Sequence, residues 1–265
     1  MQSLLIIGYG NLAHSIVKGI TPNTYNLFVL GRDFEKAKAF CADFPSHSIT
    51  PIQNIAELKD LNPIILLCVK PKGLQNFSCN FASPLIYSVM AGVKIESILT
   101  QFPNAKAYVR AMPNIGAFVK KSATALYAYT KESKDKSLST QAKEIALSLT
   151  LSFGNAVWVD SEDLIDSSIA TSGSSPAFLC LVAQALIDAG VREGLNATQS
   201  KELVQATFEG FAELLKLHSP SEIKTLVTSP AGTTAEGLAY LEERGFKGIL
   251  EQGAHQSTLK AKGKI

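Results

Sequence analysis

The sequence has 265 residues, of which 46% are hydrophobic and 18% are charged, and its formal net charge is +2. A chain this apolar is not intrinsically disordered, and its length allows one large domain or two unequal ones. The balance of 25 basic against 23 acidic residues argues against a nucleic-acid binder, and a charged fraction below the roughly 25% of an average domain points to a subunit interface.

Signals for a membrane, for secretion and for metal binding are missing from the sequence. No apolar run approaches the roughly 18 residues of a membrane-spanning helix, and the densest runs are 64–69 and 178–187. The N-terminus lacks the basic region and cleavage site of a signal peptide. The four cysteines form no CxxC pair, and the four histidines are scattered. We therefore expect a cytoplasmic protein with reduced thiols and no metal, membrane or nucleic-acid partner.

The N-terminal half alternates strands with helices. An apolar strand at 3–7 leads through a glycine-rich turn into an amphipathic helix, and a strand at 26–30 precedes a helix that Asp33 caps. The run 64–69 is apolar on both faces, as is typical of a central parallel strand. This alternation predicts a Rossmann-type doubly wound α/β sheet over residues 1–160. Further strand candidates are 85–90, 106–110, 122–127 and 156–159.

The turn after the first strand has the sequence G-x-G-x-x-A. Gly8 permits a tight turn, Gly10 lets the backbone approach a pyrophosphate, and Ala13 leaves room for the helix to pack on the strand. The pyrophosphate would lie on the free N–H groups and positive dipole of the helix N-terminus. A glycine turn of purely structural use is the alternative, but the position between strand and helix favours a dinucleotide site.

The end of the second strand bears on which dinucleotide binds. NAD sites usually place Asp or Glu there for the ribose 2′-hydroxyl, whereas this strand ends in Leu30 and Gly31, followed by Arg32. A guanidinium suits the 2′-phosphate of NADP. Asp33 lies near the spacing of a ribose ligand, but its place before Phe34 favours a helix cap. We therefore predict NADP(H) as the preferred cofactor, with NAD(H) as the alternative.

The C-terminal half, 161–265, is predicted to be a smaller, all-helical domain. A short helix at 163–170 is broken by 171–176, and the next segment, 177–191, is apolar on almost every face. A helix of this kind must be buried. A domain of this size could hardly cover it alone, which favours a second subunit over burial against the N-terminal domain of the same chain. A longer helix follows, and Thr198 is its predicted cap.

The loop 229–234 opens a further helix, which is expected to continue to Glu243. Like 171–176, this loop is rich in Ser, Thr, Gly and Pro. Both openings present hydroxyls and backbone N–H groups, a combination that suits a carboxylate. By local sequence alone, two well-capped helices are the simpler interpretation.

Motifs in a recurring order run along nearly the whole chain. The N-terminal half contains IGYGNLA (7–13), VKP (69–71), MAGV (90–93) and RAMPN (110–114). The C-terminal half contains SGSSPAF (172–178), DAGV (188–191), TSPAGTT (228–234) and LEERGF (241–246). Together they resemble the pyrroline-5-carboxylate reductases, which catalyse the last step of proline synthesis. The two C-terminal loop motifs are specific to this family, whereas many dehydrogenases share the first glycine motif.

The resemblance implies a set of cofactor and substrate residues. The substrate carboxylate would lie on Ser229 and the backbone around Gly232 and Thr233, with Ser172 as a further substrate residue. The hydroxyl of Thr234 would meet the ring nitrogen. The implied cofactor residues are Ile7, Gly8, Tyr9, Gly10, Asn11, Leu12, Arg32, Asn54, Val69, Lys70, Pro71, Met90, Ala91 and Gly92.

The resemblance also implies an assembly. In the family, the C-terminal helices of two subunits interlace, and dimers often assemble into a larger ring. This agrees with the apolar segment 177–191, which points to a homodimer on independent grounds.

Four positions depart from the family pattern. Ser175 replaces a glycine, Phe178 a tyrosine, Ala231 the first glycine of a Pro-Gly-Gly-Thr loop, and Leu12 a methionine of similar volume. Ala231 would be strained if the loop needs φ > 0, which glycine tolerates and alanine does not. We expect the departures to leave the fold intact and to bear on the geometry of the substrate.

The implied reaction is hydride transfer from NADPH to the C=N carbon of a cyclic imine, which gives a secondary amine. It needs proximity more than acid–base groups, with Thr234 orienting the nitrogen. A 3-hydroxyacid dehydrogenase of similar layout is one alternative, but it would place a lysine on the helix at 177–191, which has none. A catalytically silent NADP-binding dimer is the other alternative, and the departures keep it open.

Overall fold

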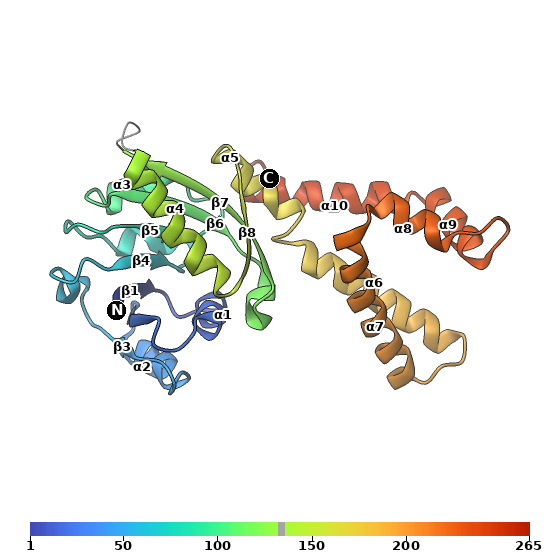
Figure 1. Ribbon diagram of the computed structural model, residues 1–265, viewed down its shortest axis with the longest axis horizontal. Helices are drawn as coiled ribbons and strands as arrows, with labels where there is room; N and C mark the ends of the chain where they lie inside the picture. Colours follow the sequence, from blue (N-terminus) through green and yellow to red (C-terminus); the bar gives the residue numbers. More distant parts are fainter. Residues whose placement is uncertain (132–135) are drawn as a thin grey trace. The chain divides into compact units, whose positions relative to one another are not determined.

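The computed structural model describes residues 1–131 and 136–265, which form two compact units. The first unit contains Met1–Ser174 and the C-terminal residues Ser257–Ile265, and the second contains Ser175–Gln256. Figure 1 shows the sheet in the first unit, whereas the second is built from helices. The predicted fold class, a Rossmann-type sheet followed by a helical region, is therefore confirmed.

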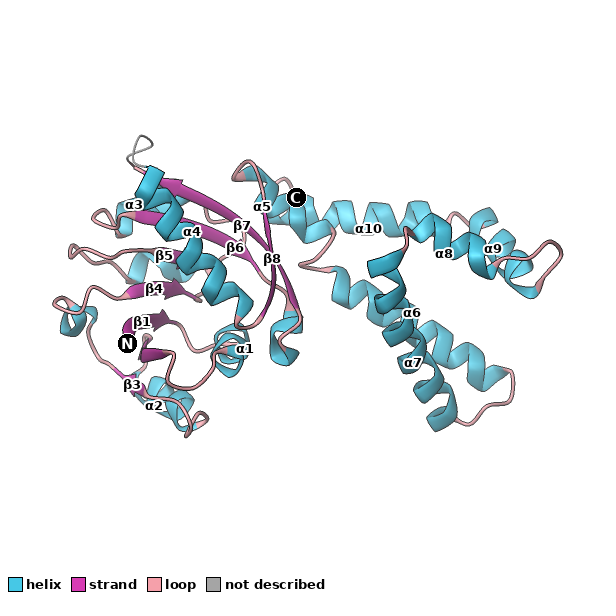
Figure 2. Ribbon diagram, viewed as in Figure 1, coloured by secondary structure: helices cyan, strands magenta, loops and turns pink. Residues whose placement is uncertain are grey.

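An eight-stranded sheet organises the described part of the first unit (Figure 2). Its order is β3-β2-β1-β4-β5-β6-β7-β8, and the neighbours are parallel except for β6 and β7. The chain crosses over between β1 and β4, which creates a crevice at the carboxyl ends of these strands, where doubly wound folds bind ligands. The strands are β1 (Gln2–Ile7), β2 (Tyr25–Leu30), β3 (Ile49–Pro51), β4 (Ile64–Leu67), β5 (Ile86–Ser88), β6 (Ala107–Met112), β7 (Ser122–Thr130) and β8 (Gly154–Trp158).

Successive side chains of β1 enter two different cores. Leu4 and Ile6 pack in the core that α1, α2 and α4 cover, and Leu5 and Ile7 pack in the opposite core with α3. All four are fully buried, which explains why the central strands are apolar on both faces. The helical segments of this unit are α1 (Asn11–Gly19), α2 (Phe34–Ala42), η1 (Ile55–Leu58), η2 (Pro71–Asn76), α3 (Ile95–Gln101), η3 (Ile115–Val119), α4 (Lys136–Leu151), α5 (Asp163–Ser167) and η4 (Ser168–Ala170).

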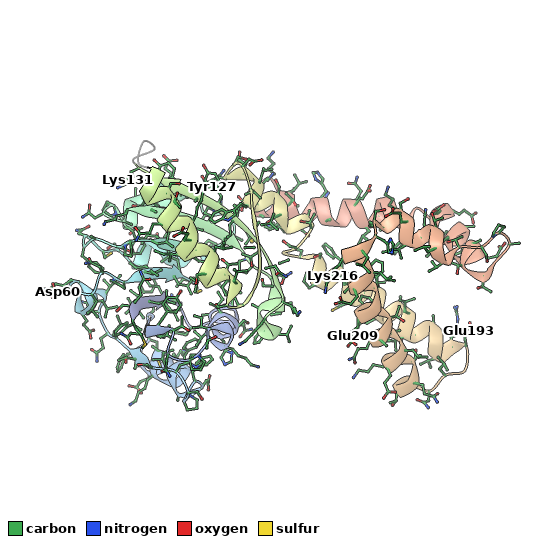
Figure 3. All side chains as sticks on the ribbon, viewed as in Figure 1. Asp60, Tyr127, Lys131, Glu193, Glu209 and Lys216 are labelled. Atoms are coloured by element: carbon green, nitrogen blue, oxygen red, sulfur yellow. The ribbon has the colours of Figure 1, made fainter. Side chains whose placement is uncertain are left out.

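The second unit is formed by helices, and two of them, at Ala197–Leu217 and Pro220–Val227, begin with a side-chain cap. The Asn196 side chain accepts a hydrogen bond from the backbone of Gln199, whose own side chain accepts from the backbone of Asn196. This reciprocal cap starts α7 before Thr198, so the predicted cap at Thr198 is wrong. Figure 3 labels Glu209 and Lys216, two exposed charged residues of α7. The helices are α6 (Ser175–Arg192), α7 (Ala197–Leu217), α8 (Pro220–Val227), α9 (Thr233–Glu243) and α10 (Phe246–Ala261).

Helix α6 leaves most of its apolar side chains partly or largely exposed in the single chain. None of its residues is buried, and Leu179 and Leu181 are 51% and 67% exposed. Burial of this helix within one chain, the alternative to a subunit interface, is therefore not observed.

One helical stretch meets the length and composition of a membrane span. Asp163–Arg192 is long and apolar enough on average by these criteria alone, although no continuous apolar run within it approaches 18 residues. The stretch joins α5, η4 and α6, with the turn 171–174 between them. Because buried helices of ordinary globular proteins pass the same test, this is weak evidence for a membrane.

The first compact unit extends beyond the last strand. Strands end at Trp158, close to the predicted domain boundary at residue 160. Helix α5 nevertheless packs with the sheet, because Asp166 of α5 pairs with Arg110 of β6. The end of α10 returns to the same unit, where Ala261 packs on a small cluster that includes Ile165.

Candidate active site

The turn between β1 and α1 has a backbone that only glycine can adopt. Gly8 has φ = 113°, and a Cβ atom there would lie 2.7 Å from the carbonyl oxygen of Cys68. Its N–H donates to the carbonyl of Leu30 at 2.8 Å. The turn is therefore held tightly between β2 and β4, at the crevice of the sheet.

The N-terminus of α1 is open toward this crevice. Gly10 is the N-cap and makes no side-chain cap hydrogen bond, and a Cβ there would meet no atom within 4 Å. Ala13, on the opposite side of the first turn, is fully buried against the sheet. The first N–H groups of a helix lack partners within the helix. The turn thus offers uncapped donors and space for an anion.

A cavity of about 360 Å³ lies at this turn. It brings together six of the predicted cofactor residues, and its charged residues are Arg32, Lys70 and Lys72. No carboxylate is among the described residues that line it, which suits a ligand with several phosphates. The lining residues are Gly8, Tyr9, Gly10, Gly31, Arg32, Cys68, Val69, Lys70, Lys72, Gly73 and Phe77.

The sequence interpretation missed Lys72 as a lining residue. It directly follows the Val-Lys-Pro motif and belongs to η2, which begins at Pro71. A proline in the first turn starts a helix readily. The position of Lys72, one residue after a motif at the end of a strand, could have indicated that its cation lines the cavity.

The end of β2 shows why no carboxylate follows this strand directly. A Cβ atom on Gly31 would lie 2.0 Å from the ring of Tyr9, so a side chain there would displace the tyrosine. Asp33 caps α2, because its Oδ1 accepts a hydrogen bond from the backbone N–H of Lys36 at 3.1 Å. The predicted cap role of Asp33 is therefore confirmed.

One cysteine, Cys68, lies at the site and is half-buried. Burial raises the pKa of the Cys68 thiol far above its ordinary value, although Cys68 lines the cavity. Because the thiolate is the nucleophile, Cys68 contributes shape and not reactivity. No group of three His, Cys, Asp or Glu side chains arranged for a metal ion occurs among the residues that the structure describes.

Other predicted cofactor residues lie outside this cavity. Asn54 caps η1, where its side chain accepts from the backbone of Ala56 and Glu57 completes the capping box. Met90, Ala91 and Gly92 form a loop that follows β5 at the carboxyl edge of the sheet, here called the Met90–Gly92 loop. Ile7 ends β1, Asn11 and Leu12 begin α1, and Pro71 begins η2.

The predicted substrate residues of the second unit gather at the N-terminus of α9. Gly232 is the N-cap without a side-chain cap, and its N–H donates to the carbonyl of Ser229 at 3.0 Å. A Cβ on Gly232 would lie 2.4 Å from Oγ of Ser229, so glycine is needed for this hydroxyl position. Thr233 and Thr234 occupy the first turn of the helix. The arrangement offers a hydroxyl and uncapped N–H groups to a carboxylate.

Ala231 adopts a positive φ, the conformation that would strain an alanine at this position. Its φ is 55°, in the left-handed region where a Cβ atom costs about 1 kcal/mol. The alanine that replaces the family's usual glycine is therefore strained, immediately before the helix N-terminus.

Ser172 belongs to the first unit, where side chains fix its position. Its hydroxyl donates to the carbonyl of Ser168 at 3.0 Å, and its own carbonyl accepts from Nδ2 of Asn114 at 3.0 Å. Asn114 also accepts from the backbone N–H of Gly116. The 110–114 motif thus holds the start of the loop that leads into α6.

Two family models match different parts of the chain. Residues 162–264 match the family model for pyrroline-5-carboxylate reductase dimerisation, and residues 3–92 match that for NADP oxidoreductase coenzyme F420-dependent. The chain is thus similar to an NADP-binding oxidoreductase domain and to a domain through which subunits associate.

Relatives cover the chain from end to end. A pyrroline-5-carboxylate reductase of Helicobacter pylori strain J99 is 38% identical over 98% of this chain and 99% of its own. The solved structure of the Streptococcus pyogenes enzyme covers 98% of both chains, with 28% identity and a TM-score of 0.86. The Plasmodium falciparum pyrroline carboxylate reductase with NADP bound covers 99% and 97%, with 25% identity and a TM-score of 0.78. The chain therefore belongs to the pyrroline-5-carboxylate reductase family.

Proposed function

We propose that this enzyme reduces 1-pyrroline-5-carboxylate to L-proline with NADPH, as the last step of proline biosynthesis in the cytoplasm. The observation that carries the proposal is the presence of two sites in one chain that belongs to this family. One is a cationic cavity at a glycine turn, and the other is an uncapped helix N-terminus beside Ser229. The first suits a dinucleotide and the second suits a small carboxylate.

The cavity supports NADP(H) over NAD(H). The Tyr9 ring occupies the space of a side chain at Gly31, where NAD sites often present a carboxylate to the ribose. Asp33 is engaged as a helix cap, while the guanidinium of Arg32 lines the cavity and suits a 2′-phosphate. NAD(H) remains the alternative cofactor.

The cofactor residues divide between the two halves of a dinucleotide. The backbone of residues 7–12 would hold the pyrophosphate, with Arg32 and Asn54 on the adenosine side. Val69, Lys70 and Pro71, together with the Met90–Gly92 loop, would line the nicotinamide half. This assignment follows the family motifs and the position of both loops at the carboxyl ends of β4 and β5.

The reduced nicotinamide, when bound, supplies the hydride that the C=N carbon accepts. A protonated imine is already electrophilic, so the nitrogen becomes a secondary amine without a further strong acid. Ser229 and the backbone at Gly232 and Thr233 bind the carboxylate, Ser172 completes the substrate site, and the Thr234 hydroxyl orients the ring nitrogen. Catalysis then comes from holding the two reactants at attack distance.

A homodimer through the C-terminal helices completes the proposal. Helices α6, α9 and α10 line an apolar cavity of about 420 Å³ in the second unit. Its walls include Phe178, Leu181 and Phe246, and Leu181 and Phe246 are exposed in the single chain. A second copy of the chain, bound through its dimerisation domain, would cover this surface, and dimers would assemble further into a ring.

The experiment is an assay of purified protein with pyrroline-5-carboxylate and NADPH. We expect NADPH consumption that depends on the imine and yields proline. Oxidation of a 3-hydroxyacid with NADP⁺ in place of imine reduction would favour the dehydrogenase alternative. NADPH binding without turnover of either substrate would favour a silent NADP-binding dimer.

A further inference from the structure

A buried ion pair joins the sheet to α5 beside the Met90–Gly92 loop. The Arg110 side chain, on β6, is 1% exposed. Its Nη2 donates to Oδ1 of Asp166 at 2.7 Å, and its Nη1 donates to Oδ2 of the same residue at 3.3 Å. Nη1 also donates to Oε1 of Glu162 at 3.2 Å. The Arg110–Asp166 contact is therefore a two-pronged pair shielded from water.

The two carboxylates also hold the backbone that follows β5. Oδ1 of Asp166 accepts a hydrogen bond from the N–H of Gly92 at 3.2 Å. Oε1 of Glu162 accepts from the N–H of Ile95, the first residue of α3, at 2.7 Å. The segment from Gly92 to Ile95 is thus fixed at both ends by groups that Arg110 orients.

The C-terminal end of the chain confines Gly92 from another direction. Gly92 has φ = 70°, and a Cβ atom there would lie 2.8 Å from the carbonyl oxygen of Ala261. Lys262 holds this end against α5, because its Nζ donates to Oγ of Ser167 at 2.8 Å. The loop therefore has little freedom to move toward α10.

Energetics favour an orienting role for the pair over a stabilising one. The desolvation of two buried charges offsets much of their attraction, and apolar replacements of such pairs are often neutral in stability. Nε of Arg110 is buried without a hydrogen-bond partner among the described residues, which adds a further cost. A bidentate contact, by contrast, fixes direction as well as distance.

We propose that the Arg110–Asp166 pair positions the Met90–Gly92 loop, and through it the nicotinamide ring, for hydride transfer. The inference rests on the proposed function, in which this loop lines the nicotinamide half of the cofactor. A displacement of about 1 Å at the reacting atoms can cost on the order of 100-fold in rate. Loss of the pair therefore lowers kcat, while the glycine turn and Arg32 continue to hold the rest of the cofactor.

The test compares two variants. One is a double variant that combines Arg110→Met and Asp166→Leu, and the other is the control Lys94→Met. The double variant fills the same space with apolar groups and removes the acceptor for Gly92 N–H. The control removes an ion pair between two exposed side chains, that of Lys94 just before α3 and that of Asp163 in α5. We expect the double variant to lose about 10- to 100-fold in kcat with pyrroline-5-carboxylate and NADPH. Its Kd for NADPH, from fluorescence titration, stays within about threefold of the wild-type value, and the control keeps the wild-type kcat.

Three results would overturn the proposal. The first is a folded double variant with wild-type kcat, and the second is a rise in Kd that accounts for the whole loss of activity. If the double variant does not fold, Asp166→Asn keeps the shape of the side chain and serves in the same comparison. Misfolding of both variants, the third result, would assign the pair to stability. A wild-type protein that does not reduce the imine contradicts the proposed function itself, and is seen before any variant is made.

Discussion

Backbone strain at a single residue marks the substrate loop. Ala231 has φ = 55° where the family usually has glycine, and the next residue caps α9. An alanine in this region costs about 1 kcal/mol, which the packing of the second unit must offset. Such a strained conformation persists only where the surrounding structure holds the loop in place.

Ala231→Gly should raise the free energy of unfolding by about 0.5–1 kcal/mol, because glycine adopts this conformation without strain but loses more backbone entropy on folding. Denaturant titration of the two proteins measures the difference. Ala239→Gly, in the interior of α9, is the matched control and should destabilise by about 1 kcal/mol. A destabilised Ala231→Gly variant would show that the strain is absent.

Arg32→Ala tests the choice of cofactor. The guanidinium lines the cationic cavity, and loss of a charge-assisted contact to the 2′-phosphate should raise the KM for NADPH by about 10- to 100-fold. The KM for NADH, which lacks that phosphate, should change little. Steady-state kinetics with both cofactors give the comparison, with Lys59→Ala, an exposed cation outside the cavity, as the control. Equal effects on the two cofactors would remove Arg32 from this role.

Thr234→Ala tests the orientation of the substrate nitrogen. We expect kcat/KM for the imine to fall by about 10- to 100-fold, as for the loss of a positioned hydroxyl. Thr234→Ser keeps the hydroxyl and should recover most of the activity. Circular dichroism of both variants checks that α9 remains helical. A fully active Thr234→Ala enzyme would leave this residue with a helical role alone.

At the scale of elements, α6 combines an apolar composition with an exposed environment in the single chain. None of its residues is buried, and the 162–264 region matches a dimerisation domain. Burial of an apolar leucine gives roughly 2 kcal/mol, so the exposed leucines of this helix favour association against its entropic cost.

Leu181→Glu should therefore weaken the dimer, because it introduces a charge into the apolar cavity of the second unit. Analytical ultracentrifugation over a range of concentrations is the measurement. Leu61→Glu changes a leucine of the first unit that is 50% exposed and serves as the control that keeps the dimer. Identical sedimentation of wild type and Leu181→Glu would place the interface elsewhere.

The elements could be predicted where periodicity and capping agree. The parallel strands β1, β2 and β4 and the Asp33 cap were predictable, because burial on two faces and an N-cap have local signatures. The start of α7 was not, since Asn196 and Thr198 are both good caps and Gln199 decides between them. The antiparallel pairing of β6 with β7 depends on the short η3 connection, whose geometry has no clear signature in the sequence.

At the scale of the whole molecule, the sequence predicts the cofactor cavity better than the substrate site. The glycine turn and Arg32 are local to one crevice, so their motif spacing already places them together. Contacts between distant segments were not predictable, because Gly92, Asp166 and Ala261 are far apart in sequence. The substrate residues come from both compact units, and their roles stay predictions that follow the family motifs.

The central claim is hydride transfer from the nicotinamide to the carbon of a cyclic imine. The most direct measurement uses NADPH that carries deuterium at the transferable position of the nicotinamide, with unlabelled pyrroline-5-carboxylate, and follows proline by mass spectrometry and NMR. The account predicts a single deuterium in proline, on the ring carbon that was double-bonded to nitrogen. Proline without deuterium, or no proline at all while NADPH binds, would contradict it.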